Sequence, residues 1–141
     1  MKTFDTYRRL YKVTGTIDRS EEYQTILKLP IETQREIFIF VKSLQLCEVE
    51  TNDFVTYCVM DPFELKRFIS FSEITGIEYI IKDITDNVIL GKDVVECQYV
   101  YNTLVSIFLE NTLTPDMVLD KINMVGVDKL TEIDKKILEK N

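Results

Sequence analysis

The sequence contains no histidine and no tryptophan among its 141 residues. Without histidine, the Ser-His and Cys-His nucleophile pairs, every histidine-containing zinc site and the usual proton shuttle of neutral-pH catalysis are excluded. Only four glycines are present, at positions 15, 76, 91 and 126, and they are too far apart to form a phosphate-binding loop. The absences predict a non-enzymatic protein with no catalytic residue, no cofactor and no metal site.

Cysteine is scarce, and its spacing is uninformative for metal or redox chemistry. Cys47, Cys58 and Cys97 form no Cys-x-x-Cys pair, which excludes zinc ribbons and thioredoxin-type motifs. The first residues lack the apolar region of a secretory signal, and the longest apolar run, residues 99–109, is too short to span a membrane. We therefore expect a cytoplasmic protein, or a component of a virion assembled in the cytoplasm, with buried and inert thiols.

The net charge of −7 is unevenly distributed along the chain. Residues 1–20 hold five basic and two acidic side chains, and residues 120–141 hold five of each, so the negative charge is concentrated between them. An acidic body repels phosphate backbones, which makes nucleic acid an unfavourable partner. The basic first segment suits an acidic surface on another protein.

Apolar periodicity and capping residues predict a helix-rich α+β fold with a small antiparallel sheet, in a single domain over residues 1–111. The expected helices cover 3–13, 18–29, 29–44, 61–75 and 93–111. A β-hairpin is expected over 47–60, turning at Asn52-Asp53, and Asp86-Asn87 is expected to turn a strand over 77–82 into a short strand over 88–90. The expected core residues are Phe38, Val41, Leu65, Phe68, Leu104 and Phe108, and Ile69 is also expected to face inward.

Residues 112–141 predict a helical hairpin appended to this domain. Thr114 and Thr131 are expected N-caps, Pro115 suits a first helical position, and Gly126 suits the end of the first helix. Two helices this short are not stable alone, so their apolar side must dock on a surface. That surface is either a partner protein, which is the interpretation we adopt, or the helix over 93–110. The apolar side consists of Val118, Ile122, Val125, Ile133 and Ile137.

Two polar clusters each have a functional and a structural interpretation. Asp83, Asp86, Asn87 and Asp93 supply oxygen ligands for a divalent cation, but Asp and Asn are equally typical of a polar turn followed by an N-cap, which we favour. Tyrosines and basic residues alternate over 7–12, as in surfaces that stack single-stranded nucleic acid. A surface helix with tyrosines packed on the domain is the simpler interpretation.

Two segments resemble known bacterial proteins. The hairpin is similar to the short helical tail of some rhomboid-family membrane proteins of Bacteroidetes. The matching residues are Leu119, Asp120, Lys121, Ile122, Gly126, Leu130, Thr131, Asp134, Lys135 and Leu138. This resemblance covers no membrane domain and implies no protease activity. Residues 26–44 resemble the leucine-proline helix of small antitoxin-like proteins, and together the two segments imply an origin in that phylum or its phages.

The resulting hypothesis is an adaptor or assembly subunit, encoded by a phage or a member of the Bacteroidetes, that contacts other proteins within a larger assembly through its two terminal segments. A virion or connector component belongs to this class. The expected contact residues are Arg8, Arg9, Lys12, Val118, Ile122, Val125, Ile133 and Ile137. The second hypothesis is a small acidic inhibitor of a host nucleic-acid enzyme. The third is a metal enzyme that depends on carboxylates.

Overall fold

The computed structural model describes residues 4–16, 24–42, 45–50, 53–75, 79–92, 99 and 101–139. Its four strands are β1 (Arg9–Thr16), β2 (Gln45–Glu50), β3 (Asp53–Met60) and β4 (Tyr79–Asp83). They form one antiparallel sheet in the order β2-β3-β1-β4. Helix α2 (Ile31–Lys42) lies between β1 and β2 in the chain, and α3 (Pro62–Thr75) lies between β3 and β4. This is the split βαβ arrangement, in which each helix-linked pair of strands is separated by a strand of the other pair.

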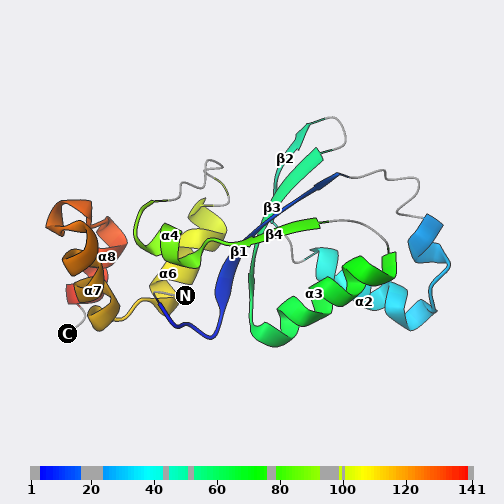
Figure 1. Ribbon diagram of the computed structural model, residues 1–141, viewed down its shortest axis with the longest axis horizontal. Coiled ribbons are helices and arrows are strands. Elements are labelled where there is room, and N and C mark those ends of the chain that lie inside the picture. Colours follow the sequence, from blue (N-terminus) through cyan, green and yellow to red (C-terminus); the bar gives the residue numbers. More distant parts are fainter. Residues whose placement is uncertain are drawn as a thin grey trace.

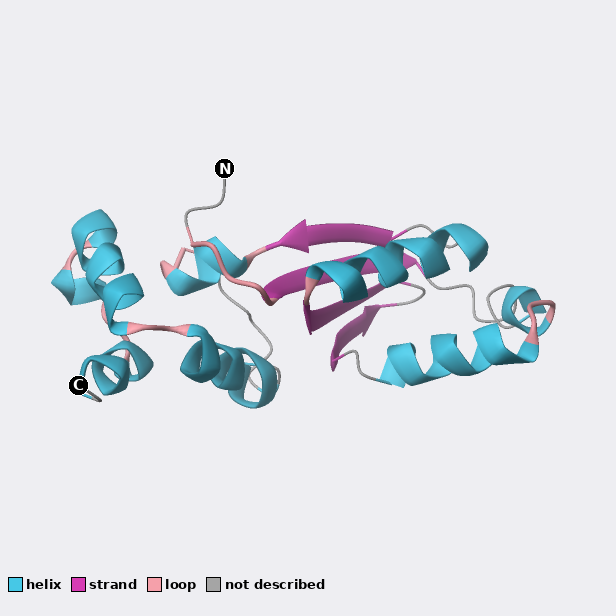
Figure 2. Cartoon of the chain, turned by 90° about the horizontal axis from the view of Figure 1, so that it is seen from below, coloured by secondary structure: helices cyan, strands magenta, loops and turns pink. Residues whose placement is uncertain are grey.

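Helices α2 and α3 lie on the same side of the sheet (Figures 1 and 2). They contact each other through Arg67 of α3 and Glu36 of α2, whose charged atoms are 3.1 Å apart. The buried ring of Phe68 anchors α3 on this face, where it forms a small core with sheet residues. These are Tyr11, Val13, Cys58 and Met60, with Tyr79 and Ile81 partly buried beside them.

The helices that follow β4 gather beyond the end of the sheet where β1 begins (Figure 1). They are α4 (Thr85–Ile89), the π-helical segment η1 (Tyr101–Val105), α6 (Ser106–Thr112), α7 (Pro115–Val125), the 3-10 turn η2 (Val127–Lys129) and α8 (Glu132–Glu139). Their buried side chains form the larger core, which also receives Phe4, Leu10 and Tyr57 from the first part of the chain and from the sheet. The fold is thus α+β and helix-rich, as predicted.

Several local predictions are confirmed by the hydrogen bonds that cap the helices. The Asp61 carboxylate accepts a bond from the Glu64 N–H at 2.8 Å, and the Glu64 carboxylate accepts one from the Asp61 N–H at 3.3 Å. The Thr114 hydroxyl accepts a bond from the Met117 N–H at 3.2 Å. The predicted β-hairpin is also present, but Asp53 already belongs to β3, where it pairs with Glu50, and Asn52 lies outside the described residues.

The predicted helix over 3–13 is wrong, because residues 9–16 form the central strand β1. Phe4, Tyr7, Leu10 and Tyr11 match helical spacing in the sequence, but Leu10 and Tyr11 are both buried on opposite faces of the sheet. A strand covered on both faces loses the alternation of apolar and polar residues that identifies strands in a sequence. Gly15, expected to end that helix, pairs with Phe54 and Tyr79 inside the sheet.

Three further expectations need correction. Asp86 and Asn87 do not form a turn into a strand, because residues 85–89 form α4. The helix expected over 93–111 is interrupted by η1, while residues 93–98 lie outside the described part of the chain. Ile69 is exposed on α3 rather than buried.

Two of the expected core residues, Phe68 and Phe108, are confirmed as buried. Leu65 and Leu104 are partly buried against them. The side chains of Phe38 and Val41, the other two expected core residues, lie outside the described residues, as do the residues of the second expected helix before position 24.

Candidate functional site

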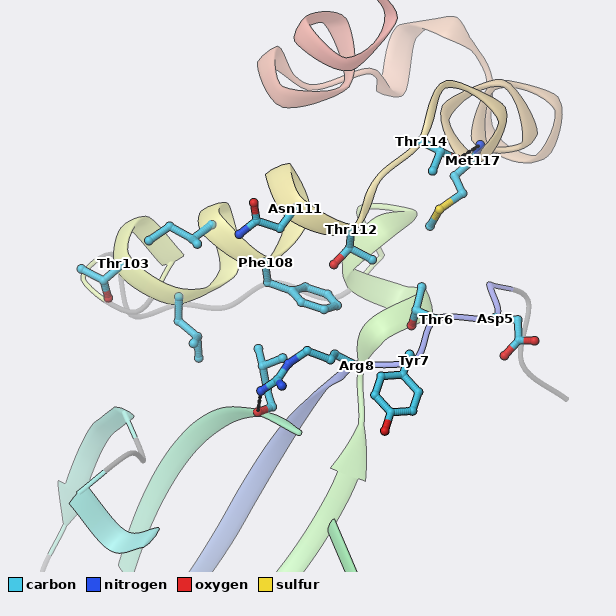
Figure 3. Close-up of a pocket in the computed structure, with 13 residues that line it drawn as sticks. Asp5, Thr6, Tyr7, Arg8, Thr103, Phe108, Asn111, Thr112, Thr114 and Met117 are labelled. Carbon is cyan, nitrogen blue, oxygen red and sulfur yellow. Dashed lines mark hydrogen bonds between the residues drawn. The ribbon is translucent and has the colours of Figure 1, made fainter. Parts of the chain in front are cut away.

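A cleft of about 550 Å³ opens between the segment at residues 5–8 and the helical residues 103–117 (Figure 3). One wall is the segment 5–8 that leads into β1. The opposite wall is η1 with α6, and the start of α7 closes one end. The cleft therefore joins the basic N-terminal segment to the first helix of the hairpin, two parts of the chain that the sequence singled out separately.

The floor of the cleft is apolar and its rim is polar. Val59 of β3, Leu104 of η1, Phe108 of α6 and Met117 of α7 supply the apolar surface. The rim consists mostly of hydroxyl, amide and charged side chains, with the exposed Tyr7 and Ile107 among them. The polar members are Asp5, Thr6, Arg8, Thr103, Asn111, Thr112 and Thr114. Figure 3 shows the Phe108 ring pointing from α6 towards the segment that carries Thr6 and Arg8.

The π-helical turn of η1 places Thr103 and Leu104 at the cleft. A π turn carries one extra residue, occurs mostly as a single turn within an α-helix, and is frequent at functional sites. The Thr103 hydroxyl donates a bond to the Tyr99 carbonyl at 2.7 Å, which gives that carbonyl a partner where the α-helical pattern is interrupted. The irregular turn thus contributes directly to the wall of the cleft.

Arg9 holds the N-terminal wall in place. Its guanidinium donates to the Asp83 carboxylate at 2.6 Å, to the Asp86 carboxylate at 3.2 Å and to the Phe4 carbonyl. The Phe4 N–H in turn donates to Asp86 at 3.1 Å. Phe4 itself is buried in the larger core, so the residues that follow it are fixed at both ends.

The charges of this Arg9 cluster stabilise each other despite their burial. Burial opposes the charged form of Arg9, but the hydrogen bonds and charges of Asp83 and Asp86 outweigh it and raise the pKa of Arg9. Burial likewise opposes ionisation of Asp83, but bonds from Arg9 and Thr85 and the charge of Arg9 lower the pKa of Asp83. Two of the carboxylates considered for a cation therefore bind a guanidinium, while Asp93 lies outside the described residues.

A second buried ion pair fixes the hairpin behind the cleft. The Lys121 ammonium of α7 lies 2.6 Å from the Asp134 carboxylate of α8, and both side chains are only 2% exposed. Asp134 also accepts a bond from the Thr131 N–H at 2.9 Å, and the Thr131 hydroxyl accepts one from the Asp134 N–H. Lys121 and Asp134 thus join the two helices of the hairpin, and Thr131 caps α8 as predicted.

The hairpin packs its apolar side on its own chain. Val118, Ile133 and Ile137 are buried, and they share a core with Phe108 and Leu109 of α6. Ile122 and Val125 are half-buried. Val118, Ile133 and Ile137 thus pack against α6, as expected of a lid on the preceding helix, while a docking role for this side stays a prediction.

The expected basic contact residues separate into three environments. Arg8 lines the cleft and forms an ion pair with Glu64 at 3.2 Å. Arg9 is buried with its side chain 4% exposed, so it is unsuited to a surface contact. Lys12 is half-buried on β1. Thr103, Asn111 and Thr112 also line the cleft, although none of them was expected at a site. The polar run over 110–112, between two apolar segments, is the sequence signal that indicates them.

The thiol of Cys58 is buried on the face of the sheet that α3 covers. Burial, and secondarily the charge of Glu64, raises the pKa of Cys58 to about 12, which keeps its thiol protonated at neutral pH and unsuited to nucleophilic attack. Over these same residues, no group of three or more Cys, Asp or Glu side chains is placed to hold a metal ion. An apolar floor with a polar rim is suited to binding.

None of the described helices is both long and apolar enough to cross a membrane. Comparison of the chain with protein-family models, with curated proteins and with solved structures finds no match.

Proposed function

We propose that the protein is a non-enzymatic adaptor or assembly subunit that binds a partner protein through the cleft shown in Figure 3. The observation that carries this proposal is the exposure of apolar groups around the cleft. Tyr7 is 73% exposed and Ile107 is 53% exposed, and both line it. Exposed apolar groups that are gathered around a concave surface and rimmed by polar residues are typical of protein-interaction sites.

The open form of the cleft favours a protein over a small molecule. A small-molecule site encloses most of its ligand's surface. Here Phe108 alone among the lining residues is buried, and more than half of the others are exposed. An apolar centre surrounded by Thr and Asn groups instead has the anatomy of a protein interface, with a desolvated core inside a hydrogen-bonding rim. We infer that a large apolar side chain of the partner occupies the floor.

The rigid surroundings of the cleft support the same function. The Arg9 cluster fixes one wall, and the Lys121–Asp134 pair fixes the hairpin whose first helix closes one end. A preformed site loses less conformational entropy when a partner binds. In this proposal the terminal segments form the contact surface, as the sequence indicated, but through the cleft rather than through the apolar side of the hairpin.

Site-specific photo-crosslinking tests this function. A photoreactive phenylalanine analogue is introduced at Ile107, next to the cleft, and in a separate variant at Leu119, which is similarly exposed on α7 but does not line the cleft. Both full-length variants are expressed in the source cells and irradiated. We expect the variant at position 107 to form a cross-linked product with a partner protein. The variant at position 119 should give no product of the same mass.

The captured partner is then purified and titrated by calorimetry. Ile107→Glu should weaken its binding by roughly tenfold or more, because the charge is placed beside a desolvated centre, whereas Leu119→Glu should leave it unchanged. Equal labelling at both positions, or equal affinity of the two Glu variants, would refute the proposal. A small molecule that co-purifies with the wild type and is lost from Ile107→Glu in native mass spectrometry would reassign the cleft to ligand binding.

A further inference from the structure

The sheet has a second surface that is separate from the cleft. Phe68 and α3 cover the face on which Tyr11 and Val13 lie, so their neighbours in β1, Lys12 and Thr14, lie on the other face. The register places Lys82 opposite Lys12 and Ile80 opposite Thr14 on that face. Ile80 is 72% exposed and Lys82 is exposed, while Lys12 is half-buried. None of these residues lines the cleft.

The pairing of Lys12 with Lys82 is unfavourable within the isolated chain. Like charges directly opposite each other on neighbouring antiparallel strands are destabilising. The chain has 24 acidic and 17 basic residues, yet among the described residues no carboxylate forms an ion pair with either lysine. A lysine on an edge strand can serve to prevent aggregation, which would explain Lys82. That explanation does not apply to Lys12, because β1 has a neighbouring strand on each side.

Strand β4 also has an open edge over the part of the chain that the structure describes, where it pairs with β1 alone. The Ile84 N–H donates to the Leu10 carbonyl at 3.0 Å, which identifies Leu10 and Ile84 as a hydrogen-bonded pair of β1 and β4. Antiparallel partners are hydrogen-bonded at every second pair, so Lys82 and Ile80 direct their backbone groups to β1. The N–H and C=O groups of Ile81 are therefore directed away from β1.

We propose that β4 and the lysine pair bind an extended acidic segment of a partner protein, which adds to the sheet as a strand beside β4. The backbone groups of Ile81 would bond this strand, as in other complexes formed by strand addition. On the face that carries Ile80 and Lys82, an apolar side chain of the segment would lie beside Ile80 and a carboxylate beside Lys82. The carboxylate would offset the repulsion between Lys82 and Lys12. This binding surface is separate from the cleft, and the proposal for it does not depend on the function proposed for the cleft.

Two other occupants fit the surface less well. Single-stranded nucleic acid needs exposed aromatic rings on which bases stack, but Tyr57, the neighbour of Lys12 on β3, is 5% exposed. A second copy of the chain, paired through β4 about Ile81, would place its own Lys82 diagonally across from the first lysine pair. That arrangement adds positive charge where the surface lacks negative charge.

The test is a titration of the isotope-labelled full chain, followed by the NMR shifts of its backbone amides. The first probe is a ten-residue peptide that alternates valine and glutamate, and the second has lysine in place of glutamate. We expect the glutamate peptide to shift the amides of residues 79–83 and the lysine peptide to leave them in place. Lys82→Glu should weaken the glutamate peptide roughly tenfold and give the lysine peptide measurable affinity. The control Lys136→Glu makes the same charge change at an exposed residue of α8 and should alter neither titration.

Other outcomes would overturn the proposal. They are the absence of shifts in residues 79–83 at millimolar glutamate peptide, equal binding by Lys82→Glu, and stronger shifts with an oligothymidine or oligouridine probe. Shifts of residues 79–83 that depend on protein concentration alone would assign the edge to a second copy of the chain. If Lys82→Glu changes amide shifts throughout the protein, Lys82→Gln replaces it, with the expectation that the glutamate peptide binds several-fold more weakly.

Discussion

Replacing Asp134 by alanine should be among the most destabilising substitutions outside the apolar core. The carboxylate of Asp134 is buried with the ammonium of Lys121, and it also accepts a hydrogen bond from the Thr131 N–H. Asp134→Ala would leave a buried ammonium without its counter-charge and an N–H at the start of α8 without its acceptor. The pair joins α7 to α8, so the loss acts on the hairpin that covers α6.

The expected cost can be worked from these contacts. Breaking a buried ion pair by removing one partner costs about 3–5 kcal/mol, because an uncompensated charge remains inside the protein. The lost hydrogen bond from the Thr131 N–H contributes about 1 kcal/mol more. Domains are stable by only about 5–15 kcal/mol, so the variant should lose a large part of its free energy of unfolding.

Urea unfolding followed by circular dichroism measures the effect. A loss of about 4 kcal/mol corresponds to a midpoint lower by about 2 M urea for a slope near 2 kcal/mol/M. The double variant Lys121→Met with Asp134→Leu removes both charges and should recover most of the lost stability. A deficit of about 1 kcal/mol should remain, because the Thr131 N–H still lacks its acceptor. A loss below about 1 kcal/mol in Asp134→Ala, or a double variant less stable than the single one, would refute the reasoning.

Three further predictions concern the Arg9 cluster, the larger core and the buried thiol. Because folding lowers the pKa of Asp83, its ion pair stabilises the protein above about pH 4, the ordinary aspartate value, and this contribution is lost as the pH falls through the folded pKa. Acid unfolding of the wild type should therefore depend more steeply on pH below 4 than that of Asp83→Asn. Phe108→Ala should cost about 3–5 kcal/mol in urea unfolding, whereas Ile107→Ala, at an exposed neighbour, should cost less than about 1 kcal/mol. With its pKa near 12, Cys58 should resist iodoacetamide at pH 8 in the native protein and react in urea, as measured by the mass of its tryptic peptide.

Where local chemistry decides structure, the sequence was sufficient. Asp61, Pro62 and Glu64 mark the start of α3 because the capping box is formed by residues three positions apart. Thr114 and Gly126 mark the start and the end of α7 for the same local reason. Gly126 has the positive φ of 93° that favours glycine. The hairpin of β2 and β3 followed from alternating β-branched residues. The α+β class rests on such short-range signals.

Contacts between distant parts of the chain could not be predicted in this way. Arg9 was assigned to a surface because the sequence shows its positive charge but not its partners, which lie 74 and 77 positions away. The same limitation hid the cleft, whose walls come from residues near positions 7 and 107. Strand β1 was mistaken for a helix because burial on both faces removes its alternation.

The larger core has a consequence for synthesis on the ribosome. It joins Phe4 and Leu10 to Ile133 and Ile137, so it cannot close until nearly the whole described chain has been translated. The sheet with α2 and α3 needs only residues up to Asp83 and is available earlier. At about 5–20 residues per second, several seconds pass before α8 emerges. During that interval the nascent chain presents the apolar face around Leu10 and Tyr57 uncovered, which makes it a substrate for chaperones that bind exposed apolar segments near the ribosome exit.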